Sequence, residues 1–387
     1  MIVSVPDVRT VERLTHTVKT IAEFRAPAGS TWLPLLVDGS QGSVTINDLS
    51  VFPGRTCSFR CMGRNDDGTS PLDQGLSTLG GWVRLFHEIT RTDLTTFRVP
   101  LGYYRIQTLT VDPLALAITV DGSDAGIMLN DYGLAWLWQA ELAQGAVIRD
   151  FLNSLLLAPT GGIPPWWAHT DVFDRTVLPT TLSTTRVQHK GTRSDAVRDT
   201  LKTFGSWVMD MPVDASYVYR ARLMPTATSP VDFTLTPGDT GNLEEVQTSV
   251  TRAAIYNVAY VNYTPPGSSV PTRIAREYTA NAAVAAGGPF GRASVEAVGE
   301  NITNDAQANA RADAVLAGTV SQARTLKVST TPIYGVEAGD VVNVVGRNGS
   351  IAVGRVSGAT IPLSVTAGWS LNILAFDPTA NIERAVQ

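Results

Sequence analysis

The sequence predicts a mainly β fold with α+β parts, arranged as several domains. Along most of the chain, short segments of alternating apolar and polar residues follow one another, and turn residues separate them. Charged residues make up only 17% of the 387 residues, whereas 33 glycines and 22 prolines favour strands joined by tight turns. A chain of this length exceeds one ordinary hydrophobic core, which indicates more than one domain.

The first region, residues 1–113, is predicted to form a β-barrel or sandwich, and we expect a barrel domain. Turn signals such as DGSQG and NDDGT separate its alternating segments. Together with one further segment beyond residue 113, these are LTHTVKTIAEFR, TWLPLLV, GSVTINDLSVF, TCSFRCM, WVRLFHEI, TTFRVP, YYRIQTLTV and ALAITV.

The second region, residues 114–250, is predicted to be an α+β domain because the hydrophobic period changes. A helix near 146–157 is indicated by one apolar stripe, made of Ile148, Phe151, Leu152, Leu155 and Leu156. A second helix, residues 195–204, begins after Ser194 as N-cap and ends at Gly205. A β-hairpin follows at 207–223.

The third region, residues 251–387, is predicted to be a second β-barrel domain with an alanine-rich helix at 304–320. Asn304 and Gln307 have the spacing of a capping box at the start of that helix. Strands LKVSTTPI, DVVNVV, IAVGRV and LNILAF close the chain, and Asn348-Gly349 predicts a hairpin turn between the middle two. No repeat with a period of about 20 to 50 residues is visible.

Charge and hydropathy exclude two classes of protein. A formal net charge of −5 argues against specific nucleic-acid binding, which needs clustered Lys and Arg. No apolar run approaches the roughly 18 residues of a membrane-spanning helix. Charges at Asp7, Arg9, Glu12 and Arg13 stand where a secretory signal would need an apolar core, so we expect the chain to stay in the cytoplasm initially after synthesis.

The only cysteines, Cys57 and Cys61, are not expected to form a disulfide. They lie in one predicted strand, where four residues span about 13 Å, beyond the roughly 7 Å between Cα atoms that a disulfide tolerates. No histidine or further cysteine is near enough in the sequence to complete a zinc site. Two buried apolar thiols are the better interpretation.

The four histidines, His16, His87, His169 and His189, are the natural candidates for acid-base chemistry. His87 and Glu88 are neighbours in a predicted strand, so their side chains point to opposite faces. The segment Trp166-Trp167-Ala168-His169-Thr170-Asp171 could bind a sugar, but an aromatic plug between domains explains the same residues.

No catalytic, cofactor or metal site emerges from the motifs. Asn65-Asp66-Asp67-Gly68-Thr69 lacks the spacing of a calcium loop and reads as a turn, and GGPFG at 287–291 lacks the context of a phosphate-binding loop. No nucleophile elbow or zinc-protease motif is present. Paired carboxylates far apart in the sequence stay open, because glycosidases use them.

Five phrases of the sequence resemble one family when they are taken in order. The most specific phrase pairs VPLGYYRI at 99–106 with ITVDGSD at 118–124. The other phrases are GSVT and RTCS at 42–45 and 55–58, the helix at 194–205 with its hairpin, Thr251-Arg252 with Tyr256-Asn257-Val258, and the alanine-rich helix followed by Thr331-Pro332 and Gly339-Asp340-Val341-Val342. They resemble the baseplate or tail-tip hub proteins of bacteriophages, in particular minor tail proteins of actinobacterial phages. The family often has two arginines where this chain has Gly54-Arg55.

The resemblance implies a structural role without enzymatic activity. It implies a homotrimer in which two tube-like β-barrels per chain form a pseudo-sixfold ring in the virion, at the tail tip or baseplate. The implied partners are the distal tail protein or tail tube, the tape measure protein, and tail-tip or receptor-binding proteins. Two alternatives are a tail-associated cell-wall hydrolase and a carbohydrate-binding module that uses Trp166, Trp167 and Trp369.

Overall fold

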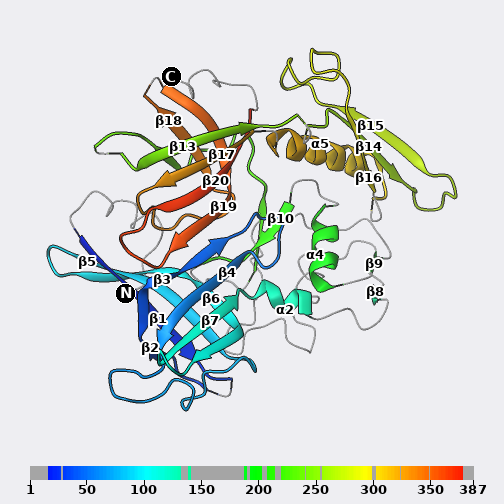
Figure 1. Cartoon of the computed structure of the whole chain (residues 1–387). Coiled ribbons are helices and arrows are strands. Elements are labelled where there is room, and N and C mark those ends of the chain that lie inside the picture. The colour runs from blue at the N-terminus through cyan, green and yellow to red at the C-terminus, as the bar shows by residue number, and fades with distance from the viewer. Residues whose placement is uncertain are drawn as a thin grey trace.

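The fold of the chain is mainly β, as predicted, and one large sheet dominates it (Figure 1). The computed structural model describes residues 16–27, 29–131, 138–140, 187–189, 192–202, 207–213, 219–239, 241–252, 255–298, 302–322, 324–347 and 349–377. Within these residues the large sheet has 13 strands, and three smaller sheets accompany it.

The N-terminal half of the large sheet lies at the bottom of Figure 1, in blue and cyan. Its spatial order is β3-β4-β7-β6-β5-β1-β2, with all neighbours antiparallel. Two segments that the sequence predicts as separate strands, TTFRVP and YYRIQTLTV, form the single strand β6, which passes through Gly102 at φ +142°. The strands are β1 (His16–Arg25), β2 (Leu33–Leu35), β3 (Val37–Ile46), β4 (Arg55–Met62), β5 (Trp82–Arg91), β6 (Thr96–Asp112) and β7 (Ala117–Ser123).

The C-terminal half of the large sheet has the order β13-β17-β20-β19, with β18 paired to β19 and β12 paired to β18. The predicted hairpin at Gly349 joins β18 to β19, which pair antiparallel. The strands are β12 (Phe233–Leu235), β13 (Leu243–Val250), β17 (Arg324–Thr330), β18 (Val341–Gly346), β19 (Gly349–Pro362) and β20 (Trp369–Ala375).

The two halves form one continuous sheet rather than two closed barrels, which corrects the barrel prediction for the described residues. The end of β19 pairs with β3, from Ala359 opposite Ile46 to Pro362 opposite Ser43. Side chains of both halves also share one hydrophobic core, for example Phe24 with Leu371 in the same buried cluster. Alternation along a strand predicts a buried face, but it does not say which sheet that face packs against.

The predicted boundary between residues 113 and 114 lies in the turn between β6 and β7, which pair with each other. The structure does not test the division into 1–113, 114–250 and 251–387, which stays a prediction. The helix predicted near 146–157 lies outside the described residues.

The predicted helix at 195–204 is confirmed as α4 (Arg193–Lys202), but its N-cap is Thr192 rather than Ser194. The Asp195 N–H donates to Oγ1 of Thr192 at 3.2 Å, and the Thr192 N–H donates to Oδ2 of Asp195 at 3.0 Å. This reciprocal pair is a capping box, which fixes the helix start two residues earlier. Nearby elements are α2 (Gly126–Asp131), β8 (Trp138–Ala140), β9 (Val187–His189) and the predicted hairpin, β10 (Trp207–Asp210) with β11 (Arg220–Leu223).

The predicted alanine-rich helix is confirmed as α5 (Asp305–Gln322), and Asn304 caps it through the Gln307 N–H at 2.9 Å. Its small side chains, such as Ala308 and Ala312, allow close packing on a small sheet. That sheet has the order β15-β14-β16 and contains β14 (Val258–Tyr263), β15 (Thr272–Glu277) and β16 (Ser294–Val298). The unit projects from the upper right of Figure 1. Among the described residues, no helix has both the length and the apolar composition of a membrane span.

Candidate functional site: a buried polar junction

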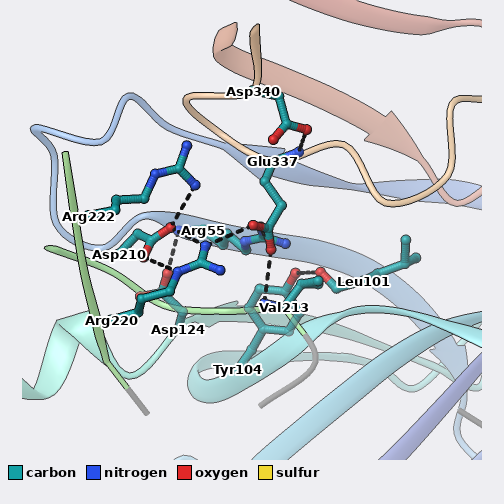
Figure 2. A network of polar contacts seen from close by, with 10 residues as sticks. All are labelled: Arg55, Leu101, Tyr104, Asp124, Asp210, Val213, Arg220, Arg222, Glu337 and Asp340. Carbon is teal, nitrogen blue, oxygen red and sulfur yellow. Dashed lines mark hydrogen bonds and ion pairs between the residues drawn. The ribbon is translucent and has the colours of Figure 1, made fainter. Parts of the chain in front are cut away.

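Charged side chains gather where the two halves of the large sheet meet the β10–β11 hairpin (Figure 2). We call this group the junction. It consists of Arg55, Asp124, Asp210, Arg220, Arg222, Glu337 and Asp340.

Regular secondary structure positions most of the junction. Arg55 is the first residue of β4, and Asp124 directly follows β7, the strand that pairs with β4. Asp210 and Arg220 lie opposite each other in the β10–β11 ladder. Their side chains form a bidentate pair, with Oδ1 to Nε at 3.1 Å and Oδ2 to Nη2 at 2.7 Å. Such paired bonds fix the arginine fork in one orientation.

Glu337 is the residue that connects all three segments. Its Oε1 accepts from Arg55 Nη2 at 3.4 Å and from the Val213 N–H at 3.2 Å, and its Oε2 accepts from Arg220 Nη2 at 2.9 Å. Burial alone would raise the pKa of Glu337, but Arg55 and Arg220 outweigh burial and lower that pKa below its usual value. Glu337 is therefore a carboxylate held between two guanidinium groups.

Asp124 holds the ends of β4 and β7 together. Its Oδ2 accepts from the Arg55 N–H at 2.5 Å, and its Oδ1 accepts from the Gly126 N–H at 3.0 Å. Burial raises the pKa of Asp124 to about 7, although these N–H groups and the charge of Arg55 act in the opposite direction. The side chain is thus fixed by backbone donors in either protonation state.

The junction leaves little room for a ligand. A cavity of about 20 Å³ lies beside it, lined by Arg55, Asp124, Asp210 and apolar side chains such as Met209 and Phe52. That volume is enough for about one water molecule. Since the carboxylates of Asp124, Asp210 and Glu337 already accept hydrogen bonds from protein groups, the arrangement is suited to holding three segments together.

Of the four histidines, the structure describes the side chain of His87 alone. It is 2% exposed, neither ring nitrogen has a hydrogen-bond partner in the described part of the chain, and it packs against the rings of Tyr334 and Trp369. Burial lowers the pKa of His87 to about 4. Glu88 points to the other face and pairs with Arg98 at 2.9 Å, as the alternation of strand side chains predicts.

The other candidate residues have mixed outcomes. His169 and the Trp166 to Asp171 segment lie outside the described residues, as do the side chains of His16 and His189. Asn65 to Thr69 forms the predicted turn, in which the Gly68 N–H donates to the Asn65 carbonyl at 2.9 Å. GGPFG at 287–291 forms turns and no helix or strand.

The two cysteines are free and buried, as predicted. Burial raises the pKa of Cys61 to about 12 and the pKa of Cys57 further. Both thiols therefore stay protonated at neutral pH and are poor nucleophiles. Within the described residues, no group of three or more His, Cys, Asp or Glu side chains is arranged to hold a metal ion.

Sequence reasoning did not assemble the junction, although several of its residues stand in the family phrases. Arg55, Asp124 and Asp340 come from three of those phrases, and Figure 2 shows them in one region of the structure. Asp210 and Arg220 lie in the predicted hairpin, but nothing in the sequence singled out their charges, and Glu337 stands in no phrase. The partners of Glu337 lie too far along the chain for local patterns to indicate them.

The comparisons with known proteins agree with the family phrases. No protein-family model matches the chain, and no curated protein matches its sequence. Among solved structures, the tail protein from Neisseria meningitidis is similar with a TM-score of 0.62 and 13% identity, over 93% of this chain and 99% of that chain. The 43 kDa tail protein of prophage MuSo2 from Shewanella oneidensis has a TM-score of 0.59 and 10% identity, over 94% and 99%. Prophage tail protein gp18 from Listeria monocytogenes has a TM-score of 0.55 and 9% identity, over 95% and 98%.

The chain has the fold of phage tail proteins. The likeness extends over nearly the whole of each chain, so it covers both halves of the large sheet as well as the elements between them.

Proposed function

We propose that this chain is a structural hub protein of a phage tail tip or baseplate, where it joins the tail tube to the tip. The observation that carries the proposal is the end-to-end match in fold to three tail proteins, each covered over 98% or 99% of its length. A match that complete indicates that the whole chain, rather than a borrowed domain, is built like a tail component.

In this proposal the chain acts by assembly rather than by catalysis, and its place is the virion. It forms a homotrimeric ring and contacts the distal tail protein or tail tube, the tape measure protein and the tail-tip or receptor-binding proteins. An acidic chain suits a ring through which DNA passes, because like charges do not hold the DNA in the bore. The buried junction suits the same role, since it stiffens the connection between both halves of the sheet.

The proposed domain division serves the ring as well. Residues 1–113 and 251–387 each supply most of one part of the tube-like wall, and 114–250 supplies the hairpin and helix beside it together with strands β7, β12 and β13 of the wall. The junction ties these three parts together through Arg55, Arg220 and Glu337.

The first test is the molar mass in solution, measured by size exclusion with light scattering over a range of concentrations. A mass near three times the 41.3 kDa of one chain is expected. A monomer at every concentration, also after the neighbouring tube protein is added, would refute ring assembly.

The two alternatives predict other results. A tail-associated hydrolase would release soluble fragments from purified peptidoglycan, and a hub would not. A carbohydrate-binding module needs exposed aromatic rings, but Trp369 is only 2% exposed and packs on Tyr334 and His87. That ring is therefore not available to a sugar.

A further inference from the structure

The two halves of the large sheet repeat one another. In the N-terminal half, β3 to β7 have the spatial order β3-β4-β7-β6-β5, and in the C-terminal half the corresponding strands have the order β13-β17-β20-β19-β18. If each set is numbered along the chain, both follow the order first, second, fifth, fourth, third. All these neighbours pair antiparallel in both halves.

Bulges fix the correspondence residue by residue. The β6–β7 ladder shifts between Ile106 and Thr108, and the β19–β20 ladder shifts between Val356 and Gly358. A second shift lies equally far upstream in both strands, at Leu101 in β6 and at Ile351 in β19. Bulges are specific features of a strand pair, so two of them at matching places align the two strands without ambiguity.

The alignment places Leu109 to Asp112 of β6 at the positions of Ala359 to Pro362 of β19. It also places β13 at the position of β3. Val250 lies opposite Arg324, the first residue of β17, just as Ile46 lies opposite Arg55, the first residue of β4. Residues 247–250 therefore correspond to 43–46.

Within the described chain, the two repeats pair along one pair of edges, β19 with β3. The corresponding pair of edges, on β6 and β13, has no partner strand among the described residues. The end of β19 pairs with β3, and the four inward side chains of this contact are 3% exposed or less: Val44, Ile46, Ala359 and Ile361. The corresponding edge of β6 extends beyond its pairing with β5, which ends at Arg105. The corresponding edge of β13, opposite β17, pairs with no described strand.

The open edges leave apolar surface exposed. Val111 corresponds to buried Ile361, and Val250 corresponds to buried Ile46, yet both valines are 49% exposed. Neither edge carries a Lys or Pro within residues 107–112 or 243–250, two of the usual devices that keep a sheet edge from pairing. The charged residues of these stretches, Asp112, Glu244 and Glu245, lie at or beyond the ends of the corresponding segments 109–112 and 247–250. Thr and Val in these stretches favour strand pairing.

We propose that β6 of one copy pairs antiparallel with β13 of a second copy and so continues the sheet across the subunit boundary. The register transferred from β19 and β3 places Leu109 opposite Val250, Thr110 opposite Ser249, Val111 opposite Thr248 and Asp112 opposite Gln247. The occupant is a second copy because the chain itself carries both halves of the missing contact, one on each repeat. A contact between two different edges is heterologous, and such contacts form a closed ring when the rotation from copy to copy closes. This inference rests on the proposed ring assembly and specifies its interface.

A cysteine pair tests the register. Within the chain, the Leu363 N–H donates to the Gly42 carbonyl at 3.0 Å, so Ile361 and Val44 form a hydrogen-bonded pair and Thr360 and Thr45 a non-hydrogen-bonded one. In the transferred register, Thr110 and Ser249 take the places of Thr360 and Thr45 and form a non-hydrogen-bonded pair. The Cα atoms of such a pair are about 4.5 Å apart, which is within disulfide range. The double variant Thr110→Cys with Ser249→Cys should form a ladder of covalent oligomers on mild oxidation, seen on a non-reducing gel and lost with reductant.

Matched variants control for chance oxidation. Glu245 lies on the same face of β13 as Ser249 but about 13 Å along the strand, so Thr110→Cys with Glu245→Cys should give no ladder. Each single variant should give no species larger than a dimer. The native Cys57 and Cys61 are buried and should not contribute.

A backbone variant tests the same contact without a disulfide cross-link. By the transferred register, the Val111 N–H points to the open edge and not to β7, so Val111→Pro removes a donor from the contact between copies alone. The variant should keep the circular dichroism spectrum of the wild type and elute as a monomer.

The outcomes separate this inference from the ring itself. If the wild type forms an oligomer while the Thr110 and Ser249 pair gives no ladder and Val111→Pro still assembles, the edge pairing is wrong and the ring stands. If the wild type is a monomer and no pair cross-links, both are wrong. A ladder from the designed pair alone supports the pairing, whether the wild-type contact is strong or weak.

Discussion

Nη2 of Arg55 and Oε1 of Glu337 lie 3.4 Å apart, although the two residues are 282 positions apart in the sequence. Both side chains are largely buried, at 8% and 14% exposure. One belongs to the start of β4 and the other to the segment before β18, so the pair connects the two repeats of the large sheet on the side of the β10–β11 hairpin. Arg220 completes the link from the hairpin at 2.9 Å.

Replacing Glu337 with Gln should lower the free energy of unfolding by about 3 kcal/mol, because the buried guanidinium of Arg55 loses its paired carboxylate and Arg220 keeps only Asp210. Chemical unfolding in urea measures this change. The matched control is Asp313→Asn, which removes an exposed ion pair with Arg276 and should change stability by less than about 1 kcal/mol. Equal effects of the two variants would show that the junction is no more important than a surface pair.

The stability of the protein should depend on pH through His87. Its pKa is about 4 in the folded chain, against 6.5 for an unperturbed histidine. Between these two values the unfolded chain binds a proton that the folded chain does not. Stability from this group is therefore complete above pH 6.5, falls as the pH drops towards 4, and is lower by about 3 kcal/mol below that pH.

The variant His87→Leu isolates this contribution. In this variant, leucine fills the space of the His87 ring beside Tyr334 and Trp369 with an apolar side chain that cannot bind a proton. Its stability relative to the wild type should therefore rise by about 3 kcal/mol between pH 7 and pH 4, because the other titrating groups cancel in the difference. A difference that does not change with pH would mean that His87 is protonated equally in the folded and unfolded chain.

The thiols of Cys57 and Cys61 should not react with thiol reagents in the folded protein. Both are buried in the N-terminal half of the core, and burial raises the pKa of each thiol. A thiol reagent such as dithiobis(nitrobenzoate) should label neither cysteine in buffer and both in concentrated urea, because only the thiolate reacts. Fast labelling of one thiol in buffer would show that this part of the core opens.

Much of the fold could be predicted from local sequence patterns. Strand β4 alternates so regularly that Cys57 and Cys61 are correctly placed on its buried face, and Asn304 correctly marks the start of α5. The repeat could not be predicted, because corresponding positions carry different side chains: Trp82 with Val341 and Tyr104 with Gly354. What the repeats share is hydrogen-bond register and bulges, which single residues do not reveal.

The junction was not predicted from the sequence, for a related reason. Arg55 and Asp124 stand in phrases that the sequence made visible, but Glu337 and Arg220 have partners in other segments of the chain. Local propensity indicates whether a residue lies in a strand or a turn. It does not indicate which distant charge will neutralise a buried arginine.

Gly102 lies within β6, which remains one strand where the sequence suggested two, and it is a sensitive backbone position. It has φ +142°, and a Cβ at this position would lie 2.5 Å from Oη of Tyr104, which donates to the Leu101 carbonyl at 2.7 Å. Gly102→Ala should therefore destabilise the protein by about 3 kcal/mol, as the sum of backbone strain and displacement of a buried ring.

Gly238→Ala separates the two causes. Gly238 also has a positive φ, +107°, but a Cβ there would meet no atom within 4 Å. That variant should lose only the backbone contribution, about 1 kcal/mol. Urea unfolding of both variants measures the difference. If Gly102→Ala lowered the free energy of unfolding no more than Gly238→Ala, the Tyr104 ring would be free to move. The bulge at Leu101 would then not depend on the hydrogen bond from the Tyr104 hydroxyl to the Leu101 carbonyl.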